Sequence, residues 1–507
     1  MNTNSGLMAV SALALAALTG CVTQTPEKAM QTVEMPTSWT ALSNEAAAGV
    51  QPVTANWIGD LNDPATAMLI DEAIARNNNL AAAAARTRAA RERVGVTRAG
   101  LLPSLRGEVQ GASRNNPATL VQDVDGTPIL APASSFDNYS IGFGLNWELD
   151  LWGRLTDQTR AAYAGARASA YDLAANQLSV AGGTAQAYYA LTEASLQRRL
   201  SERDVETGEA NLRIIERRYE RGISSSLDVR LARSSLSQSQ ATLIARQQTE
   251  LETARRLEVL LGRYPRAEIA AAETLPTLDD IVSALNLGDP ESLLVRRPDI
   301  MAAERRLKAA GLQSVAARKA LLPSLSVSGS LNQSTDSSSN LAFDIDDAVQ
   351  QIFASLTQPI FQGGRLRAQS RAAQAEAEAA MYDYAQTALA AFQEVENAVS
   401  AERLLSARAE AQRLAFEEAQ AVEDLTNRQY VNGTANIFDL INAQQRRISS
   451  ESAYIASLRA RLSNRINLYL ALGAPFETSA LNSAEAVSPF SLTSSAPIAD
   501  DKKGARL

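Results

Sequence analysis

The stretch NNNLAAAAARTRAARERVGVTRAGLLPSL at residues 77–105 recurs as RPDIMAAERRLKAAGLQSVAARKALLPSL at residues 297–325, an offset of 220. Later landmarks recur at an offset of 211: Gly153-Arg154-Leu155 with Gly364-Arg365-Leu366, Tyr219 and Gly222 with Tyr430 and Gly433, and Leu261-Gly262 with Leu472-Gly473. Self-similarity at a nearly constant offset predicts two tandem structural repeats. The change of offset places a longer loop between the two strands of the first repeat.

Each repeat predicts the same order of elements. Asp63-Pro64 and Asp289-Pro290 predict helix starts, because Asp is a favoured N-cap and Pro a favoured first helical residue. The elements expected after them are a strand hairpin, a long helix over 154–218 or 365–430, a turn that contains Gly, and a return helix over 226–261 or 436–472. A helix of about 65 residues is roughly 100 Å long, too long for a globular bundle. Apolar residues at three- to four-residue spacing in 365–430 favour a coiled-coil seam.

The chain is expected to divide into five segments. They are a lipoprotein signal peptide at 1–20, an acylated N-terminal linker at 21–62, a first repeat at 63–275 with its hairpin at 103–150, a second repeat at 276–475 with its hairpin at 323–362, and an equatorial or disordered tail at 476–507. The chain ends in SSAPIADDKKGARL, a polar composition that is typical of disorder.

The expected strands alternate with period two. In 139–148, apolar residues alternate with polar residues and glycines, so that one side of the strand carries Tyr139, Ile141, Phe143, Leu145 and Trp147. In 324–331, one side of the strand likewise carries Leu325, Val327 and Leu331. This pattern fits a half-exposed sheet on a soluble core, or a membrane barrel with lipid on one face and water on the other. The strands are about ten residues long, which suits a tilted membrane strand. The intervening loops, 114–135 and 333–350, are rich in Ser, Asn, Asp and Gly, as external loops tend to be.

Cys21 is the only cysteine and follows a short apolar run that ends Leu18-Thr19-Gly20. About a dozen apolar residues are too few to span a bilayer but suit a signal peptide. The small residues before Cys21 predict a lipobox, with cleavage before Cys21 and acylation of the new N-terminus. A buried cysteine or an ordinary signal peptide is the alternative, and residues 1–6 lack the usual positive charge. No later stretch is apolar for the length of a membrane helix, so a spanning element would have to be β.

Composition excludes several classes of function. The formal net charge is −8, which argues against nucleic-acid binding. The chain has no histidine and one cysteine, so the commonest general base, zinc ligand and disulfide are missing. We therefore predict neither an enzyme nor a resident metal or cofactor.

Two hairpins supply four strands per chain, whereas single-chain bacterial barrels need at least eight. Open edges are not tolerated in lipid. The chain must therefore oligomerise if it spans the membrane, and three copies would close one twelve-stranded barrel. The predicted fold is an α+β membrane protein, in which this barrel continues into a long helical coiled-coil periplasmic tube.

The sequence resembles the TolC-type outer-membrane efflux family, in its OprM/NodT-like lipoprotein branch, over about residues 55–475. The motifs that carry the resemblance are Asn146-Trp147-Glu148-Leu149-Asp150-Leu151-Trp152-Gly153-Arg154, Arg296-Arg297-Pro298-Asp299-Ile300, Leu322-Pro323-Ser324, Thr357-Gln358-Pro359-Ile360-Phe361, Gly363-Gly364-Arg365-Leu366 and Phe392-Gln393-Glu394-Val395-Glu396. Each motif alone is weak, but their order and duplication make the set specific.

The resemblance implies a homotrimer, anchored by lipid in the outer membrane and extending into the periplasm. It implies an equatorial belt from about 263–290 and the tail after 473, and an exit duct for small molecules and drugs in a tripartite efflux pump. The implied partners are a periplasmic adaptor and an inner-membrane pump of the RND type. Two alternatives stay open, namely the outer component of type I protein secretion and a periplasmic coiled-coil lipoprotein without a pore.

The resemblance also places a gate at the turns between the long and return helices. It implies that Asp439 contributes to an acidic ring, and that Asp228 pairs with Tyr430. Asn442 stands where relatives often carry a second acid, which departs from the pattern. Helix capping explains Asp228 and Asp439 equally well, because each lies three residues after a Ser or Asn.

Overall fold

The computed structural model describes residues 39, 51–52, 57–122, 125–126, 128–278, 285–286, 290–337 and 343–476. Cys21, the signal peptide expected at 1–20 and the tail beyond 476 lie outside these ranges. The described residues form two compact units, and each unit draws on both halves of the sequence. The sheet unit comprises Arg88–Ala166 and Glu304–Asp383, and the helical unit comprises the described parts of Met30–Thr87, Arg167–Ala303 and Tyr384–Leu507.

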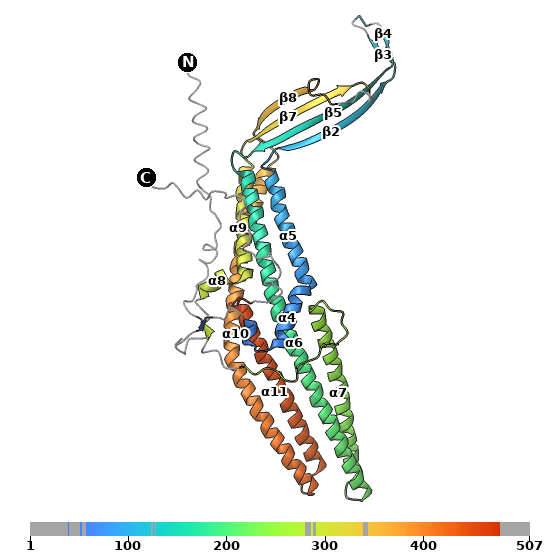
Figure 1. Ribbon diagram of the computed structural model, residues 1–507, viewed down its shortest axis with the longest axis vertical. Helices are drawn as coiled ribbons and strands as arrows, with labels where there is room; N and C mark the ends of the chain where they lie inside the picture. Colours follow the sequence, from blue (N-terminus) through green and yellow to red (C-terminus); the bar gives the residue numbers. More distant parts are fainter. Residues whose placement is uncertain are drawn as a thin grey trace, which may run out of the picture. The chain divides into compact units, whose positions relative to one another are not determined.

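The sheet unit holds a four-stranded antiparallel sheet in the order β2-β5-β7-β8. The strands are β2 (Ser104–Asn116), β5 (Ser134–Leu149), β7 (Ser324–Thr335) and β8 (Val349–Thr357). Figure 1 shows them as one curved layer. Within one copy of the chain, β2 and β8 are therefore the edges of this sheet.

The loop predicted at 114–135 is more regular than expected. β2 continues to Asn116, and β3 (Thr119–Gln122) and β4 (Pro128–Ala131) form a further two-stranded ribbon. Asp125-Gly126 lies between the apolar pairs Leu120-Val121 and Ile129-Leu130, and Gly126 has a left-handed φ of 77°. An Asp-Gly pair between apolar runs is a strong hairpin signal, which the polar composition of the wider loop obscured.

The long helices follow the sheet strands directly along the chain. They are α6 (Arg154–Glu220) and α10 (Arg365–Val431), and their return helices are α7 (Ser226–Leu260) and α11 (Ile437–Ala471). Three helices precede the strand hairpins along the chain, namely α4 (Pro64–Arg76), α5 (Asn78–Ala99) and α9 (Pro298–Lys319). The shorter elements are β1 (Gln51–Pro52), α3 (Trp57–Asp60), β6 (Leu285–Asn286), η2 (Pro290–Ser292) and α8 (Leu293–Arg296). No helix in the described ranges is both long enough and apolar enough to cross a membrane.

The expected helix starts differ between the two repeats. Asp63 caps α4, since its carboxylate accepts hydrogen bonds from the backbone N–H groups of Ala65 and Thr66 at 3.0 and 3.3 Å. In the second repeat an α-helix does not begin at Pro290, because Pro290–Ser292 form a 3₁₀ turn before α8. Asp289 lies outside the described residues. α8 ends at Arg296, and the C-cap residue Arg297 has the extended backbone that is favoured before a proline.

The core of the helical unit joins α3, α6, α7 and α11. Its buried members include Trp57, Tyr189, Leu257 and Ile466, and the Trp57 ring stacks on Tyr469 at a centroid distance of 5.9 Å. The Tyr469 hydroxyl donates a hydrogen bond to Asp60 at 3.0 Å. Burial of this apolar surface is the main force that holds the return helices against α6.

The segment after α7 is fixed by a buried carboxylate. Glu258 accepts hydrogen bonds from the backbone N–H groups of Ala267 and Glu268, both at 2.7 Å. Burial alone would raise the pKa of Glu258, but these N–H donors outweigh it and hold the pKa below its usual value. Residues 263–278, part of the segment predicted to form a belt, thus have an ordered place beside α7 although they contain no helix or strand.

Candidate channel surface and tip

The register of the sheet separates two faces. One row of paired residues across all four strands consists of Leu105, Leu145, Gly329 and Ile352. The next row consists of Arg106, Gly144, Ser330 and Gln351. Successive residues of a strand point to opposite faces, so the first row belongs to an apolar face and the second to a polar face. β8 is the exception, because Val349 and Phe353 lie on the polar face.

The apolar face is exposed within one chain. Leu105 and Ile352 have 69% and 82% of their surface exposed, and Leu356 has 67%. Phe143 packs edge-on against Phe343 at a centroid distance of 5.1 Å. A contiguous apolar patch of this kind marks an interaction surface rather than a surface that faces water.

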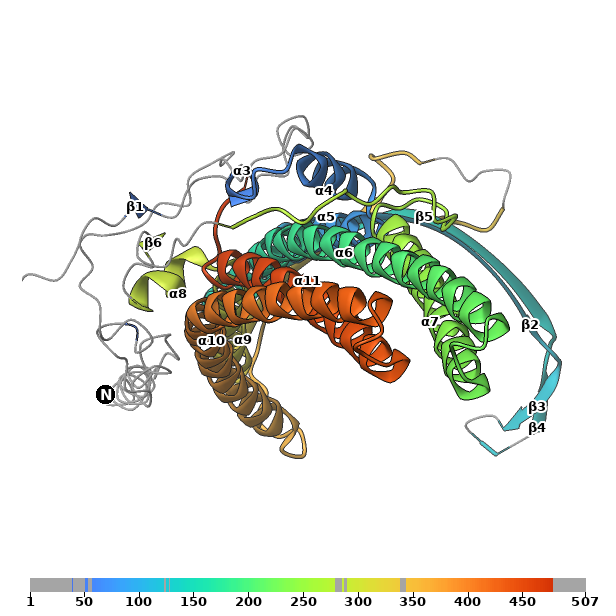
Figure 2. The ribbon, with the colours of Figure 1, turned by 90° about the horizontal axis from the view of Figure 1, so that it is seen from below.

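The hairpins α6–α7 and α10–α11 run side by side in the helical unit (Figure 2). We call the turns at 221–225 and 432–436, with the adjoining helix turns, the tip. Gly222 and Gly433 have φ of 71° and 76°, which a side chain would make costly. A buried cluster joins the two hairpins here, and its members are Ile215, Val229, Ala232, Tyr430, Ile437 and Leu440.

Asp228 and Asp439 both cap helices at the tip. Asp228 accepts from the Ser225 backbone N–H at 2.8 Å, and the Ser225 hydroxyl accepts from the Asp228 N–H at 3.2 Å. Asn436 and Asp439 form the same reciprocal pair, at 3.2 and 2.8 Å. The capping interpretation of both acids is therefore confirmed. Asp439 is exposed, whereas Asp228 is half-buried. Asn442 is half-buried one turn further along α11.

Tyr430 is held by Arg218, a residue that the sequence analysis did not single out. The Arg218 guanidinium lies 5.0 Å from the centre of the Tyr430 ring, and its Nη1 donates to the Tyr430 carbonyl at 3.3 Å. Burial raises the pKa of the Tyr430 hydroxyl, the positive charge of Arg218 partly offsets this, and the negative charge of Asp228 adds to it. The charge of Asp228 thus affects Tyr430 through space, while Arg218 contacts Tyr430 directly, and the pairing of Asp228 with Tyr430 stays a prediction.

Two further ionic clusters hold the helical unit together. Arg297, from the Arg-Pro-Asp motif, bonds Asp299 at 2.6 Å, Glu394 at 2.7 Å and the Ala471 carbonyl at 3.0 Å. Glu402 is fully buried and accepts from Arg465 at 2.5 Å and from Asn464 at 2.9 Å. No group of three or more side chains that could share a metal ion occurs in the part of the chain that the structure describes.

Comparison with known proteins agrees with these features. The family model for "Outer membrane efflux protein" matches residues 69–263 and 290–474. The chain is similar to the pyoverdine export outer membrane protein OpmQ of Pseudomonas aeruginosa, at 29% identity over 92% of this chain and 97% of that protein. It is also similar to the toluene efflux pump outer membrane protein TtgC of Pseudomonas putida, at 28% identity over 85% of this chain and 88% of that protein.

Among solved structures, the outer-membrane channel OprN has a TM-score of 0.75 at 26% identity, covering 87% of this chain and 97% of that chain. These similarities identify the chain as an outer-membrane efflux channel. The chain belongs to the outer membrane efflux protein family.

Proposed function

We propose that three copies of the chain close one twelve-stranded barrel, which continues into a helical periplasmic tunnel. The open edges of the sheet support this. All neighbouring strands are antiparallel, so β8 of one copy and β2 of the next would continue the alternation. An unpaired edge in lipid would leave backbone N–H and C=O groups without partners. Two copies would give an eight-stranded barrel, and side chains fill the interior of a barrel of that size. Three copies would give a twelve-stranded barrel, which is wide enough to leave an open lumen.

The two faces of the sheet support the same arrangement. The apolar face, with Leu105, Leu145 and Ile352, would contact lipid, and the face with Ser326, Ser328 and Ser330 would line the lumen. The tandem repeats would then supply two hairpins of strands and two hairpins of helices per copy.

Native mass spectrometry of the detergent-extracted protein tests the assembly. We expect a mass of three chains, because four strands per copy cannot close a barrel alone. A stable monomer that still conducts ions in a bilayer would contradict the proposed trimer.

We propose that Cys21 is the acylated N-terminus of the mature chain. The lipobox-like sequence before it supports this. Mass spectrometry of the membrane-purified protein should show residues 1–20 missing and acyl mass on Cys21. Recovery of an intact Met1 terminus would refute the anchor and leave the barrel proposal untouched.

We propose further that the duct carries small organic molecules, delivered by a periplasmic adaptor and an inner-membrane RND-type pump. Similarity to a pyoverdine exporter and a toluene efflux component supports this class of cargo. The tip would be the gate. Asp439 from three copies would form an acidic ring beside Asn442, and contacts around Tyr430 and Asp228 would hold it shut. Affinity purification after cross-linking should recover one adaptor and one pump; recovery of a protein-secretion ATPase instead would favour the secretion alternative.

A further inference from the structure

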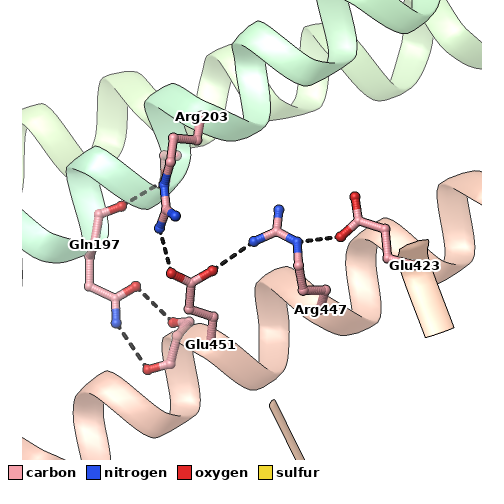
Figure 3. Close-up of polar contacts among 7 residues, drawn as sticks. Gln197, Arg203, Glu423, Arg447 and Glu451 are labelled. Carbon is pink, nitrogen blue, oxygen red and sulfur yellow. Dashed lines mark hydrogen bonds and ion pairs between the residues drawn. The ribbon is translucent and has the colours of Figure 1, made fainter. Parts of the chain in front are cut away.

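A chain of alternating charges links three helices above the tip (Figure 3). Glu451 on α11 shares its two carboxylate oxygens between Arg203 on α6 and Arg447 on α11. The contact to Arg447 measures 2.7 Å. Arg447 in turn donates from Nε to Glu423 on α10. The four side chains thus connect α6 to the α10–α11 hairpin with no net charge.

A neutral pair lies beside this chain and joins the same two helices. The Gln197 amide on α6 donates to the Ser452 carbonyl at 3.0 Å and accepts from the Ser452 hydroxyl at 2.8 Å. Gln197 is buried, with 5% of its surface exposed. We call Gln197, Arg203, Glu451 and Ser452 the clamp, because all four tie α6 to α11.

The clamp lies at the border of the main apolar core. Along α6 and α11, the buried core members nearest the turns are Leu200 and Ile455, and the half-buried Ile448 on α11 also packs against this core. The next buried cluster toward the turns is that of the tip, beginning at Ile215 on α6. The α6 segment between them is mostly polar and contains Gly208, and a glycine inside a helix lowers the stability of that helix. On α6, polar contacts therefore largely replace buried apolar packing between the main core and the tip.

The links of the charge chain differ in strength. The side chains of Glu451, Arg447 and Glu423 are 12%, 13% and 15% exposed, whereas that of Arg203 is 60% exposed. Water and salt screen an exposed ion pair far more than a sheltered one. The α6 link at Arg203 is hence the weakest, and the links inside the α10–α11 hairpin are stronger. Within this charge chain, the α10–α11 hairpin is therefore held together more firmly than it is held to α6.

We propose that the clamp is the pivot about which the α10–α11 hairpin swings when the tip opens, so that it sets the width of the open channel. This rests on the proposed function as a conduit that the tip closes. With the clamp intact, release of the tip moves only the segments between the clamp and the turns. With the clamp cut, the hairpin swings on a longer arm and the opening widens. Gln197 and Arg203 are thus positioning residues for the gate.

The experiment compares open-channel conductance in two backgrounds. One background is the parental protein, and the other is the released channel, in which Arg218→Gln and Tyr430→Phe remove the tip contacts. The clamp is cut in each background by Arg203→Gln together with Gln197→Leu. Cutting the clamp alone should leave the resting channel closed, because the tip contacts remain. Cutting it in the released background should raise single-channel conductance about twofold or more. Arg413→Gln is the matched control, since it removes an α10 arginine whose ion pairs to Glu410 and Glu417 lie within its own helix in the part of the chain that the structure describes.

A clamp that merely braces the fold gives a different result. The melting temperature would fall by the same amount in both backgrounds, and the conductance of the released channel would stay unchanged, which would overturn the proposal. An increase caused equally by Arg413→Gln would also overturn it. If the released channel passes no current even with the clamp intact, the proposed function as a conduit is contradicted. That result differs from an unchanged conductance on cutting the clamp, which contradicts only the pivot.

Discussion

Arg218→Gln should make the outer membrane leak solutes that it normally excludes. Arg218 is the direct link between α6 and Tyr430, through the ring face and the backbone carbonyl. A cation–π contact is worth about 1 kcal/mol. If three copies open together, a loss of about 3 kcal/mol shifts the closed-to-open ratio by roughly two orders of magnitude. Uptake of a fluorescent dye by cells that carry the variant measures this leak.

Arg217→Gln is the control for this prediction. Arg217 precedes Arg218 on the same helix, is exposed, and donates to the Arg213 carbonyl of its own helix at 3.1 Å. It should therefore leave the leak at the parental level. If Arg218→Gln lowers the melting temperature without added dye uptake, Arg218 only stabilises the helix end and is not part of a gate.

Glu402→Ala should strongly destabilise the helical unit. Glu402 is fully buried, and its removal takes away the carboxylate that accepts a hydrogen bond from the guanidinium of Arg465, which is 3% exposed. Breaking a buried pair by removing one partner costs about 3–5 kcal/mol. Thermal unfolding of the purified protein, followed by circular dichroism, measures the loss.

Two further variants separate charge from packing at this site. Glu410→Ala removes an exposed acid of the same helix, which pairs with Arg413, and should barely move the unfolding transition. Glu402→Leu combined with Arg465→Met removes both charges and should unfold at a higher temperature than Glu402→Ala. If the double variant is the less stable of the two, the cost arises from packing and the ionic explanation is wrong.

Local patterns predicted the regular elements well. The helices expected at 154–218 and 365–430 are present at Arg154–Glu220 and Arg365–Val431, since few Gly or Pro residues interrupt these stretches. The alternation in 139–148 and 324–331 reflects strands whose faces differ, as the register shows. The break at Asn77 follows from its side chain, which accepts from the N–H groups of Asn79 and Leu80 and so caps the next helix.

The contacts between distant segments could not be read from these patterns. Arg218 and Tyr430 are 212 positions apart, and Arg203 and Glu451 are 248 apart. Both long helices carry many charged residues, and the helical period alone does not say which of them meet. One signal was present for Arg218, because the matching position of the second repeat is Gln429, so that the two tips differ in charge there. Tyr219 and Tyr430 match in sequence, yet Tyr219 is 49% exposed and Tyr430 7%.

Single-channel recording in planar bilayers tests most directly whether three copies form a conduit closed at the tip. The parental protein should show rare, small current steps, and the variant with Arg218→Gln and Tyr430→Phe should show frequent, larger and cation-selective ones. Asp439→Ala in that background should reduce the selectivity for cations, because the acidic ring would be lost. A correctly folded assembly that inserts into the bilayer and passes no current in either form would contradict the conduit.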